Sequence, residues 1–266
     1  MKRNKALWGC VLAAALLLTG CGGSNGSSSG SGSMSGGMNS SSASGTAAYR
    51  TGLGVLTETS DDGNSGKVEL IAAAVTLDEN GRLADVQFDE LESVVTADGT
   101  GAVTLPTDDR TKRQKGDDYP LAAVSSLKKG WTEQADAFAK HLTGRTPEEV
   151  EAIKTDADGK ATDADLLSGC TIAVDRYRDA VVEACTNAKA MGAAKGDRVS
   201  VYVEAMRDAS SDTATDDRDA TVTLNVKAEA RTHDADAKLS SSVKEERTFT
   251  WTISADGGVT VEHSKT

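Results

Sequence analysis

The sequence is poor in aromatic residues, proline, histidine and cysteine. Aromatic side chains make up only 4% of the 266 residues, so small side chains must build most of the core. Three prolines favour regular helices and strands over long loops. The three histidines, His141, His233 and His263, share no metal-ligand spacing with one another or with the cysteines. A metal site is therefore not predicted, and no Walker-type loop or serine nucleophile elbow occurs.

Basic residues are also few. The chain has 29 Lys and Arg against 41 Asp and Glu, a formal net charge of −12. Three of the basic residues, Lys2, Arg3 and Lys5, lie at the N-terminus, and without these three positive charges the net charge is −15. Such an acidic chain does not favour nucleic acid or an anionic lipid surface as a partner.

The first 21 residues consist of a basic segment, an apolar run and a cysteine. The run from Ala6 to Leu18 is too short to span a bilayer, and a signal peptide over residues 1–20 fits it better. The ending Leu18-Thr19-Gly20-Cys21 resembles the lipobox of bacterial lipoproteins. The resemblance implies acyl chains such as palmitate on Cys21, and two or three chains hold a protein stably on the extracytoplasmic face of the membrane. The alternative is a cleaved signal with a free secreted product.

A low-complexity segment follows the cysteine. Gly22 to Ala48 consists almost entirely of Gly, Ser, Asn, Ala and Met, so we expect residues 21–48 to be a lipidated, disordered tether. A flexible coil of 27 residues has a root-mean-square reach of about 29 Å. Beyond it we expect an α+β domain over residues 49–190 and a β-rich region over residues 191–266.

Alternating apolar residues predict strands at both ends of this folded part. A first strand is expected within Leu53 to Thr59 and a second over Val68 to Leu77. Glu79-Asn80-Gly81 predicts a hairpin turn, because Asn and Gly accept positive φ. The return strand and the C-terminal region repeat a period of two, which is typical of half-buried antiparallel strands. The alternating residues are Ala84, Val86 and Phe88; Val199, Val201 and Val203; Val222, Leu224, Val226 and Ala228; and Phe249, Trp251 and Ile253.

Three helices are predicted between these strand regions. The first is an amphipathic helix with the apolar stripe Trp131, Ala135, Phe138 and Leu142. The second begins at Thr146-Pro147-Glu148-Glu149, where Thr caps and Pro occupies the first turn. The third begins near Asp175. Its buried face should be Tyr177, Ala180, Val181, Ala184 and Ala188. The predicted fold class is α+β, with antiparallel strands and about three helices packed on one side.

The segment Asp156-Ala157-Asp158-Gly159 resembles part of a calcium loop, with Asp165 at the twelfth position. In that alignment Lys154 occupies the first position, where an acidic ligand is required. An Asp-Gly turn between helices explains the segment without a metal.

Two cysteines remain in the folded part. Cys10 leaves with the signal peptide and Cys21 is the lipidated residue, so Cys170 and Cys185 form an even pair in an exported protein. A disulfide is one interpretation. Two buried free thiols are the other.

One short motif indicates a cofactor. Asp165-Leu166-Leu167-Ser168-Gly169-Cys170-Thr171 resembles the Asp-x-x-Ser-Gly-Ala-Thr segment of bacterial FMN-binding domains. The order of elements over residues 50–190 is also similar. The resemblance implies that a flavin transferase esterifies FMN to Thr171, with Asp165, Ser168 and Gly169 in matching positions and Cys170 replacing an alanine. The alternative is that Ser168-Gly169 is only a turn.

These patterns favour a non-enzymatic function. The leading interpretation is a membrane-anchored extracytoplasmic lipoprotein that binds or carries a ligand. Covalent FMN would make it an electron carrier with an electron-transfer partner. The alternative is a cofactor-free structural or ligand-capturing surface lipoprotein. No nucleophile and base pair is visible, so a hydrolase is not favoured.

Overall fold

The computed structural model describes residues 48–265. The predicted signal peptide, the lipobox Leu18-Thr19-Gly20-Cys21 and all of the predicted tether except Ala48 lie outside the described residues. Among the helices of residues 48–265, none has the length and apolar character needed to cross a membrane.

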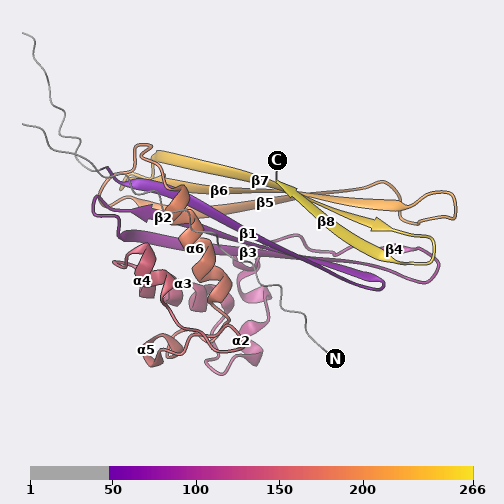
Figure 1. Ribbon diagram of the computed structural model, residues 1–266, viewed down its shortest axis with the longest axis horizontal. Coiled ribbons are helices and arrows are strands. Elements are labelled where there is room, and N and C mark those ends of the chain that lie inside the picture. The colour runs from indigo at the N-terminus through magenta and orange to yellow at the C-terminus, as the bar shows by residue number, and fades with distance from the viewer. Residues whose placement is uncertain (1–47, 266) are drawn as a thin grey trace, which may run out of the picture. The chain divides into compact units, whose positions relative to one another are not determined.

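Eight strands form two four-stranded sheets, and in each sheet every strand pairs antiparallel with its neighbour in sequence (Figure 1). The first sheet contains β1 (Arg50–Asp62), β2 (Ser65–Leu77), β3 (Leu83–Ala97) and β4 (Val103–Thr104). The second sheet contains β5 (Arg198–Ala209), β6 (Ala220–His233), β7 (Leu239–Ile253) and β8 (Val259–Lys265). The hairpin predicted around Glu79-Asn80-Gly81 is the connection from β2 to β3.

Within the described residues, all helices lie between β4 and β5. They are α1 (Lys112–Lys115), the 3-10 helix η1 (Gly116–Asp118), α2 (Leu121–Val124), α3 (Trp131–Leu142), α4 (Pro147–Glu151), α5 (Ala164–Leu167) and α6 (Asp175–Asn187). The α+β class is confirmed, but six α-helices replace the three that the sequence predicts. The predicted three are α3, α4 and α6. The additional α1, α2 and α5 have four residues each, which is too short to produce a helical period in the sequence.

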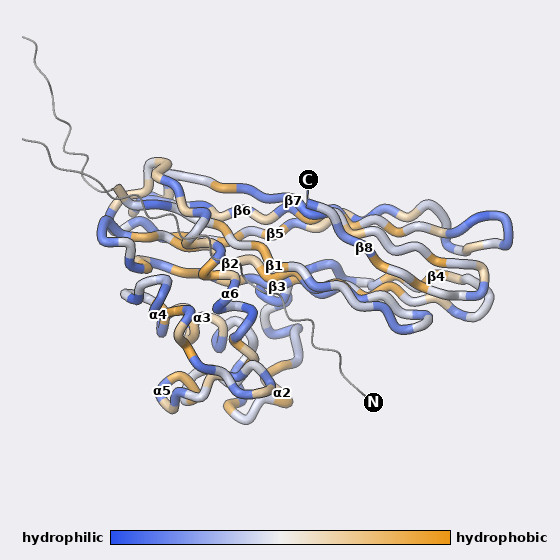
Figure 2. Tube along the Cα trace, viewed as in Figure 1, coloured by the Kyte–Doolittle hydropathy of each residue, from blue (hydrophilic) through white to orange (hydrophobic). Residues whose placement is uncertain are grey.

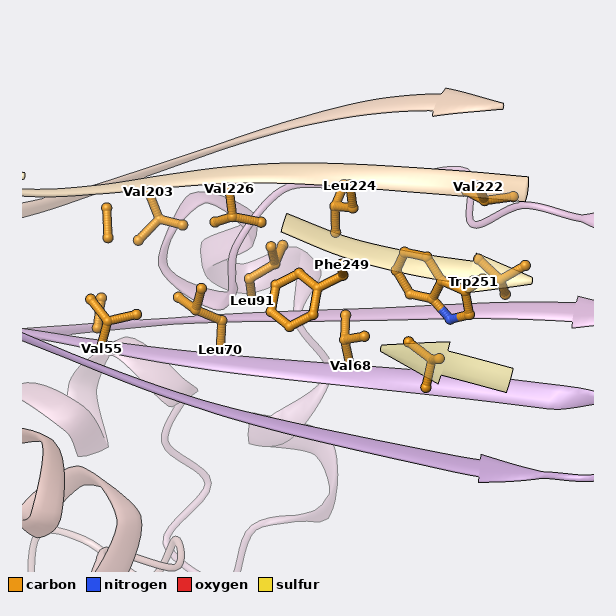
Figure 3. Packing of buried hydrophobic residues seen from close by; sticks show 14 of the residues in the cluster. Val55, Val68, Leu70, Leu91, Val203, Val222, Leu224, Val226, Phe249 and Trp251 are labelled. Atoms are coloured by element: carbon orange, nitrogen blue, oxygen red, sulfur yellow. The ribbon is translucent and has the colours of Figure 1, made fainter. Parts of the chain in front are cut away.

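One apolar core lies between the two sheets. Its side chains come from the faces of both sheets that point toward each other, as in other face-to-face sheet packings. Leu70, Leu91 and Phe249 meet in its centre, and Trp251 lies further along the same layer (Figure 3). The predicted regions 49–190 and 191–266 therefore share this core.

A second core lies between the other face of the first sheet and the helices. It contains the predicted α3 stripe, with Trp131 and Phe138 almost completely buried. Because β2 is covered on both faces, every residue from Leu70 to Leu77 is buried and apolar residues follow one another without alternation. The acidic connection between β5 and β6 is hydrophilic and mostly exposed (Figure 2).

Glycine allows α6 to lie directly against β1. A Cβ atom at Gly54 would be 2.1 Å from the carbonyl oxygen of Ala180, and one at Gly52 would be 2.0 Å from that of Ala184. Both alanines belong to the predicted buried face of α6. The structure confirms that face for Tyr177, Ala180, Val181 and Ala184. The last predicted residue of that face, Ala188, follows the helix and is partly buried.

The same turn occurs at four places in residues 48–265. The turns begin at Asp78, Asp98, Asp156 and Asp234. In each, one carboxylate oxygen accepts the N–H groups of the second and fourth following residues at 2.8 to 3.2 Å. The third following residue has positive φ and is glycine in three turns and Ala237 in the fourth. The calcium-like segment at Asp156 is thus an Asp-Gly turn, closed by a bridge between Thr155 and Ala161.

Candidate functional site

A cavity of about 240 Å³ lies between the first sheet and the helices. Its walls come from β2, β3, α1, the segment of Tyr119 and Leu121 that includes the start of α2, the start of α3, and the segment of Ile172 and Ala173 with the first turn of α6. The lining side chains belong to Glu69, Ile71, Glu90, Glu92, Lys112, Tyr119, Leu121, Trp131, Ile172, Ala173, Asp175, Arg176 and Tyr177. The cavity therefore combines apolar, aromatic and charged groups.

Three glutamates form a row across the first sheet on its helix side. Glu58 pairs in register with Glu69, and Glu69 pairs in register with Glu92. Glu90 lies on the same face of β3, and the carboxylates of Glu69, Glu90 and Glu92 approach within 4.8 Å of one another. Like charges placed directly opposite each other destabilise a sheet. The row therefore depends on positive groups from elsewhere.

Lys112 from α1 neutralises the buried end of this group. Its ammonium lies 2.9 Å from Glu90 Oε1 and 3.3 Å from Glu92 Oε2, and 5.1 Å from the centre of the Tyr119 ring. Burial opposes the charged form of Lys112, but the negative charges of Glu90 and Glu92 outweigh it and hold the Lys112 pKa above its ordinary value. Burial raises the pKa of Glu90 despite the ammonium beside it.

Lys67 and Arg176 neutralise the more exposed end. Lys67 contacts Glu69, and its Nζ lies 3.4 Å from Glu92 Oε1. Arg176, on α6, contacts Glu69 and lies 3.0 Å from Glu58 Oε2. Acidic and basic groups thus alternate without interruption from Glu58 to Glu92. Each glutamate already has an ammonium or guanidinium partner, so a metal ion would have to displace these groups.

Aromatic residues fix the buried end of the site. The Tyr177 hydroxyl donates to Glu90 Oε2, and Trp131 Nε1 donates to the Tyr177 oxygen at 3.1 Å. Burial and the charge of Glu90 hold the pKa of Tyr177 well above its ordinary value, so the hydroxyl remains a proton donor. The Phe88 ring packs edge-on against Tyr177 with 5.5 Å between the ring centres. Glu90 is thereby held in one position.

The residues of the flavin motif lie beside this cavity. Thr171 is half-buried, and both its N–H and its hydroxyl bond to Oε1 of the buried Gln134, at 2.9 and 3.1 Å. Ser168 is exposed and donates to the Asp165 carbonyl at 2.7 Å. Gly169 lies so close to α3 that a Cβ atom there would be 3.1 Å from Ala137 Cβ. The two residues after Thr171 line the cavity, but Thr171 itself does not.

A phosphate on Thr171 would not meet free helix amides. Three residues separate Thr171 from the start of α6. The N–H groups of Val174 and Asp175 donate to the Gly159 carbonyl, and that of Arg176 donates to the Asp175 carboxylate. These amides therefore already have acceptors within the protein.

Basic side chains do occur on the other side of the motif. Lys140 and His141 line a surface hollow of about 390 Å³ together with Asp165, Ser168 and Gly169. Burial and the nearby Arg145 lower the pKa of His141, so Lys140 is the main positive group there. Beside the motif the hollow therefore combines one positive side chain, Lys140, with the carboxylate of Asp165.

Cys170 and Cys185 are free, buried thiols in the structure. Burial raises the pKa of Cys170 to about 11 and that of Cys185 to about 12. Both side chains belong to the core between the first sheet and the helices. As thiols with such pKa values they are poor nucleophiles at neutral pH.

Sequence reasoning missed the charged cavity. Its one available signal was charge within strands, namely Glu69 beside the apolar run of β2 and the sequence Asp89-Glu90-Leu91-Glu92 within β3. Without the register of β2 against β3, neither segment indicates that the carboxylates converge.

No family model matches the chain, and no match is found among curated proteins or solved structures.

Proposed function

We propose that the protein is a lipid-anchored, extracytoplasmic binding protein without catalytic activity, and that its ligand occupies the cavity between the first sheet and the helices. The observation that carries this proposal is the in-register row Glu58, Glu69 and Glu92 beside an open cavity. Like charges placed opposite each other destabilise a sheet unless basic groups pair with them, and a chain that keeps such a charge network beside a cavity departs from a simple apolar core as functional sites do.

The lining of the cavity supports a binding role. Ligand sites are concave and mostly apolar, with a few fixed polar groups that orient the ligand. Here Ile71, Leu121 and Ile172 supply apolar surface, and the hydrogen bonds among Glu90, Tyr177 and Trp131 fix the polar groups. In this lining the Tyr177 hydroxyl and the Lys112 ammonium both contact Glu90. The raised pKa values of Tyr177 and Lys112 keep both groups protonated and therefore poorly nucleophilic, which favours binding over catalysis.

A filled-cavity variant tests this proposal. Ala173 is exposed at the edge of the cavity, so Ala173→Trp should fill the entrance without disturbing the core. We expect that at least one member of a panel of amines, amino acids, carboxylates and sugars raises the melting temperature of the wild type but not that of Ala173→Trp. Ala235→Trp, in an exposed turn of the second sheet, is the matched control and should respond like the wild type. A panel without any hit that depends on Ala173 would refute the cavity as the ligand site.

The anchor is tested separately. Acyl chains on Cys21 and a flexible tether over residues 21–48 would hold the domain at a root-mean-square distance of about 29 Å from the membrane. Cys21→Ser should release the protein into the soluble fraction of its host. Unchanged membrane retention of this variant would contradict lipid anchoring.

Covalent FMN on Thr171 is a second candidate, favoured by the hollow in which Lys140 adjoins Ser168 and Gly169. The protein would then be an extracytoplasmic electron carrier. Transfer of FMN from FAD would form a phosphoester with Thr171 Oγ1 and release AMP. Co-expression with a flavin transferase should add one FMN to the chain, and Thr171→Val should prevent the addition while keeping the side-chain shape. An unmodified mass for both the wild type and Cys170→Ala, which restores the alanine of the motif, would exclude this candidate.

A further inference from the structure

The charges that line the cavity are predominantly negative. Four acidic side chains face only two basic ones, and the acidic residues are Glu69, Glu90, Glu92 and Asp175. Lys67 lies outside the lining, and even with it the acidic groups outnumber the basic ones. The cavity therefore attracts cations and repels anions.

Its size and walls select a compact ligand with an apolar part. The volume of about 240 Å³ is below the range of about 300–1,000 Å³ that is usual for sites of drug-sized ligands. Leu121, Ile172 and the ring of Tyr119 offer apolar and aromatic contact. A bare inorganic ion would leave these walls without a partner, because they present no ligand atoms to a metal.

Lys112 shows how an ammonium group is held here. Only 9% of this residue is exposed, yet its ammonium remains charged between two carboxylates and close to the Tyr119 ring. A carboxylate pair and an aromatic face are the groups that stabilise an ammonium out of water. The lining thus already has the chemistry for one ammonium, supplied by the chain itself.

A second ammonium position lies beside the cavity, between two glutamates that line it. There Lys67 bridges Glu69 and Glu92, but its side chain is 42% exposed and belongs to the surface. An exposed lysine gains little from such a pair and can move into solvent at small cost. A ligand ammonium that replaces Lys67 would meet the same two carboxylates, while its body reaches the apolar wall.

We infer that the ligand is a small organic amine, with a primary ammonium bound between Glu69 and Glu92 and a compact apolar or aromatic body against Tyr119, Leu121 and Ile172. This inference rests on the proposed function and names the ligand class for the same cavity. An anionic ligand is disfavoured because acidic side chains outnumber basic ones in the cavity lining.

Three probes of similar size and different charge test the inference. They are phenethylamine, 2-phenylethanol and 3-phenylpropionate, titrated calorimetrically into the full chain at low ionic strength, where partly exposed charges are least screened. We expect phenethylamine to bind at least about tenfold more tightly than the alcohol and the carboxylate, the difference that one charge-assisted contact supplies.

Two variants locate the binding. Glu92→Gln should weaken phenethylamine binding about tenfold, since it removes one carboxylate but leaves Lys112 paired with Glu90. Glu262→Gln, an equal charge change on the exposed face of β8, should leave the affinity unchanged. Loss of affinity in Ala173→Trp would place the amine inside the cavity.

The outcomes separate this inference from the proposed function. If the alcohol or the carboxylate binds as tightly as the amine, and Ala173→Trp abolishes that binding, the ligand class is wrong and the binding site stands. If the amine binds equally to wild type and Glu92→Gln, the assigned carboxylates are wrong. Absence of amine binding overturns the inference, while the wider panel decides independently whether the cavity binds any ligand.

Discussion

At the scale of single residues, Lys112 balances the charge of the buried Glu90 and of its neighbour Glu92. Glu90 is only 4% exposed and its carboxylate also accepts the Tyr177 hydroxyl. A buried ion pair adds little stability over an apolar pair, but removal of one partner leaves an uncompensated buried charge. The stability of the glutamate row therefore depends on this lysine.

Replacement of Lys112 by methionine should destabilise the protein by about 3 kcal/mol at pH 7, measured by urea unfolding. Burial raises the pKa of Glu90, and loss of the ammonium removes the charge that limits this rise. Glu90 therefore takes up a proton more readily in the folded variant than in the unfolded chain. The loss of unfolding free energy relative to the wild type should become smaller as the pH falls from 7 to 5. Lys244→Met, at a largely exposed lysine, should change stability by less than about 0.5 kcal/mol. A loss of stability that grows toward pH 5 would contradict the role of Lys112 as the partner of the buried Glu90 carboxylate.

Ala237 occupies a position that glycine fills in the three related turns. Its φ is +60°, a left-handed conformation that costs a residue with a Cβ atom more than it costs glycine. Ala237→Gly should therefore stabilise the protein by about 0.5–1 kcal/mol in thermal or urea unfolding. The reverse change in the first sheet, Gly81→Ala at φ +77°, should destabilise it by a similar amount. If both substitutions changed the free energy of unfolding in the same direction, backbone conformation would not control the stability of these turns.

At the scale of elements, the long periodic segments could be predicted and the short ones could not. The α3 stripe from Trp131 to Leu142 and the strand around Phe249 have enough residues to show their period. Single-turn helices such as α1 are too short to show a helical period, although α1 carries Lys112 into the cavity. The cavity could not be predicted for a second reason. Its carboxylates converge through the register between β2 and β3, which no spacing within a single element reveals.

The packing of α6 on β1 gives a test at this scale. A methyl group at Gly54 would lie 2.1 Å from the Ala180 carbonyl oxygen, and neither backbone can yield without moving the helix. Gly54→Ala should therefore cost at least about 2 kcal/mol of stability, measured by chemical unfolding. Gly99→Ala, where the new Cβ atom would meet nothing within 4 Å, is the matched control. Equal stability of the two variants would mean that α6 does not approach β1 this closely.

At the scale of the whole molecule, the two sheets depend on each other. The first sheet packs helices on one face and the second sheet on the other, so its strands have two buried faces. The edges are joined as well: Val199 and Val201 of β5 donate their N–H groups to the side chains of Asp85 and Gln87 of β3, at 3.0 and 2.8 Å. Sequence patterns predicted the strands of both regions but not this union, since the contacts join residues more than a hundred positions apart.

The shared core predicts that the described part of the chain unfolds as one unit. Trp251 and Phe249 are fully buried against the first sheet, and Trp251 Nε1 donates to the Gly66 carbonyl at 2.8 Å. Calorimetry of residues 48–266 should therefore show a single transition in which the calorimetric and van't Hoff enthalpies agree. A fragment of residues 48–190 exposes the apolar face that the second sheet covers, so it should lack a cooperative transition and bind a hydrophobic dye. Two resolved transitions, or a cooperatively folded fragment, would instead make residues 191–266 an independent domain.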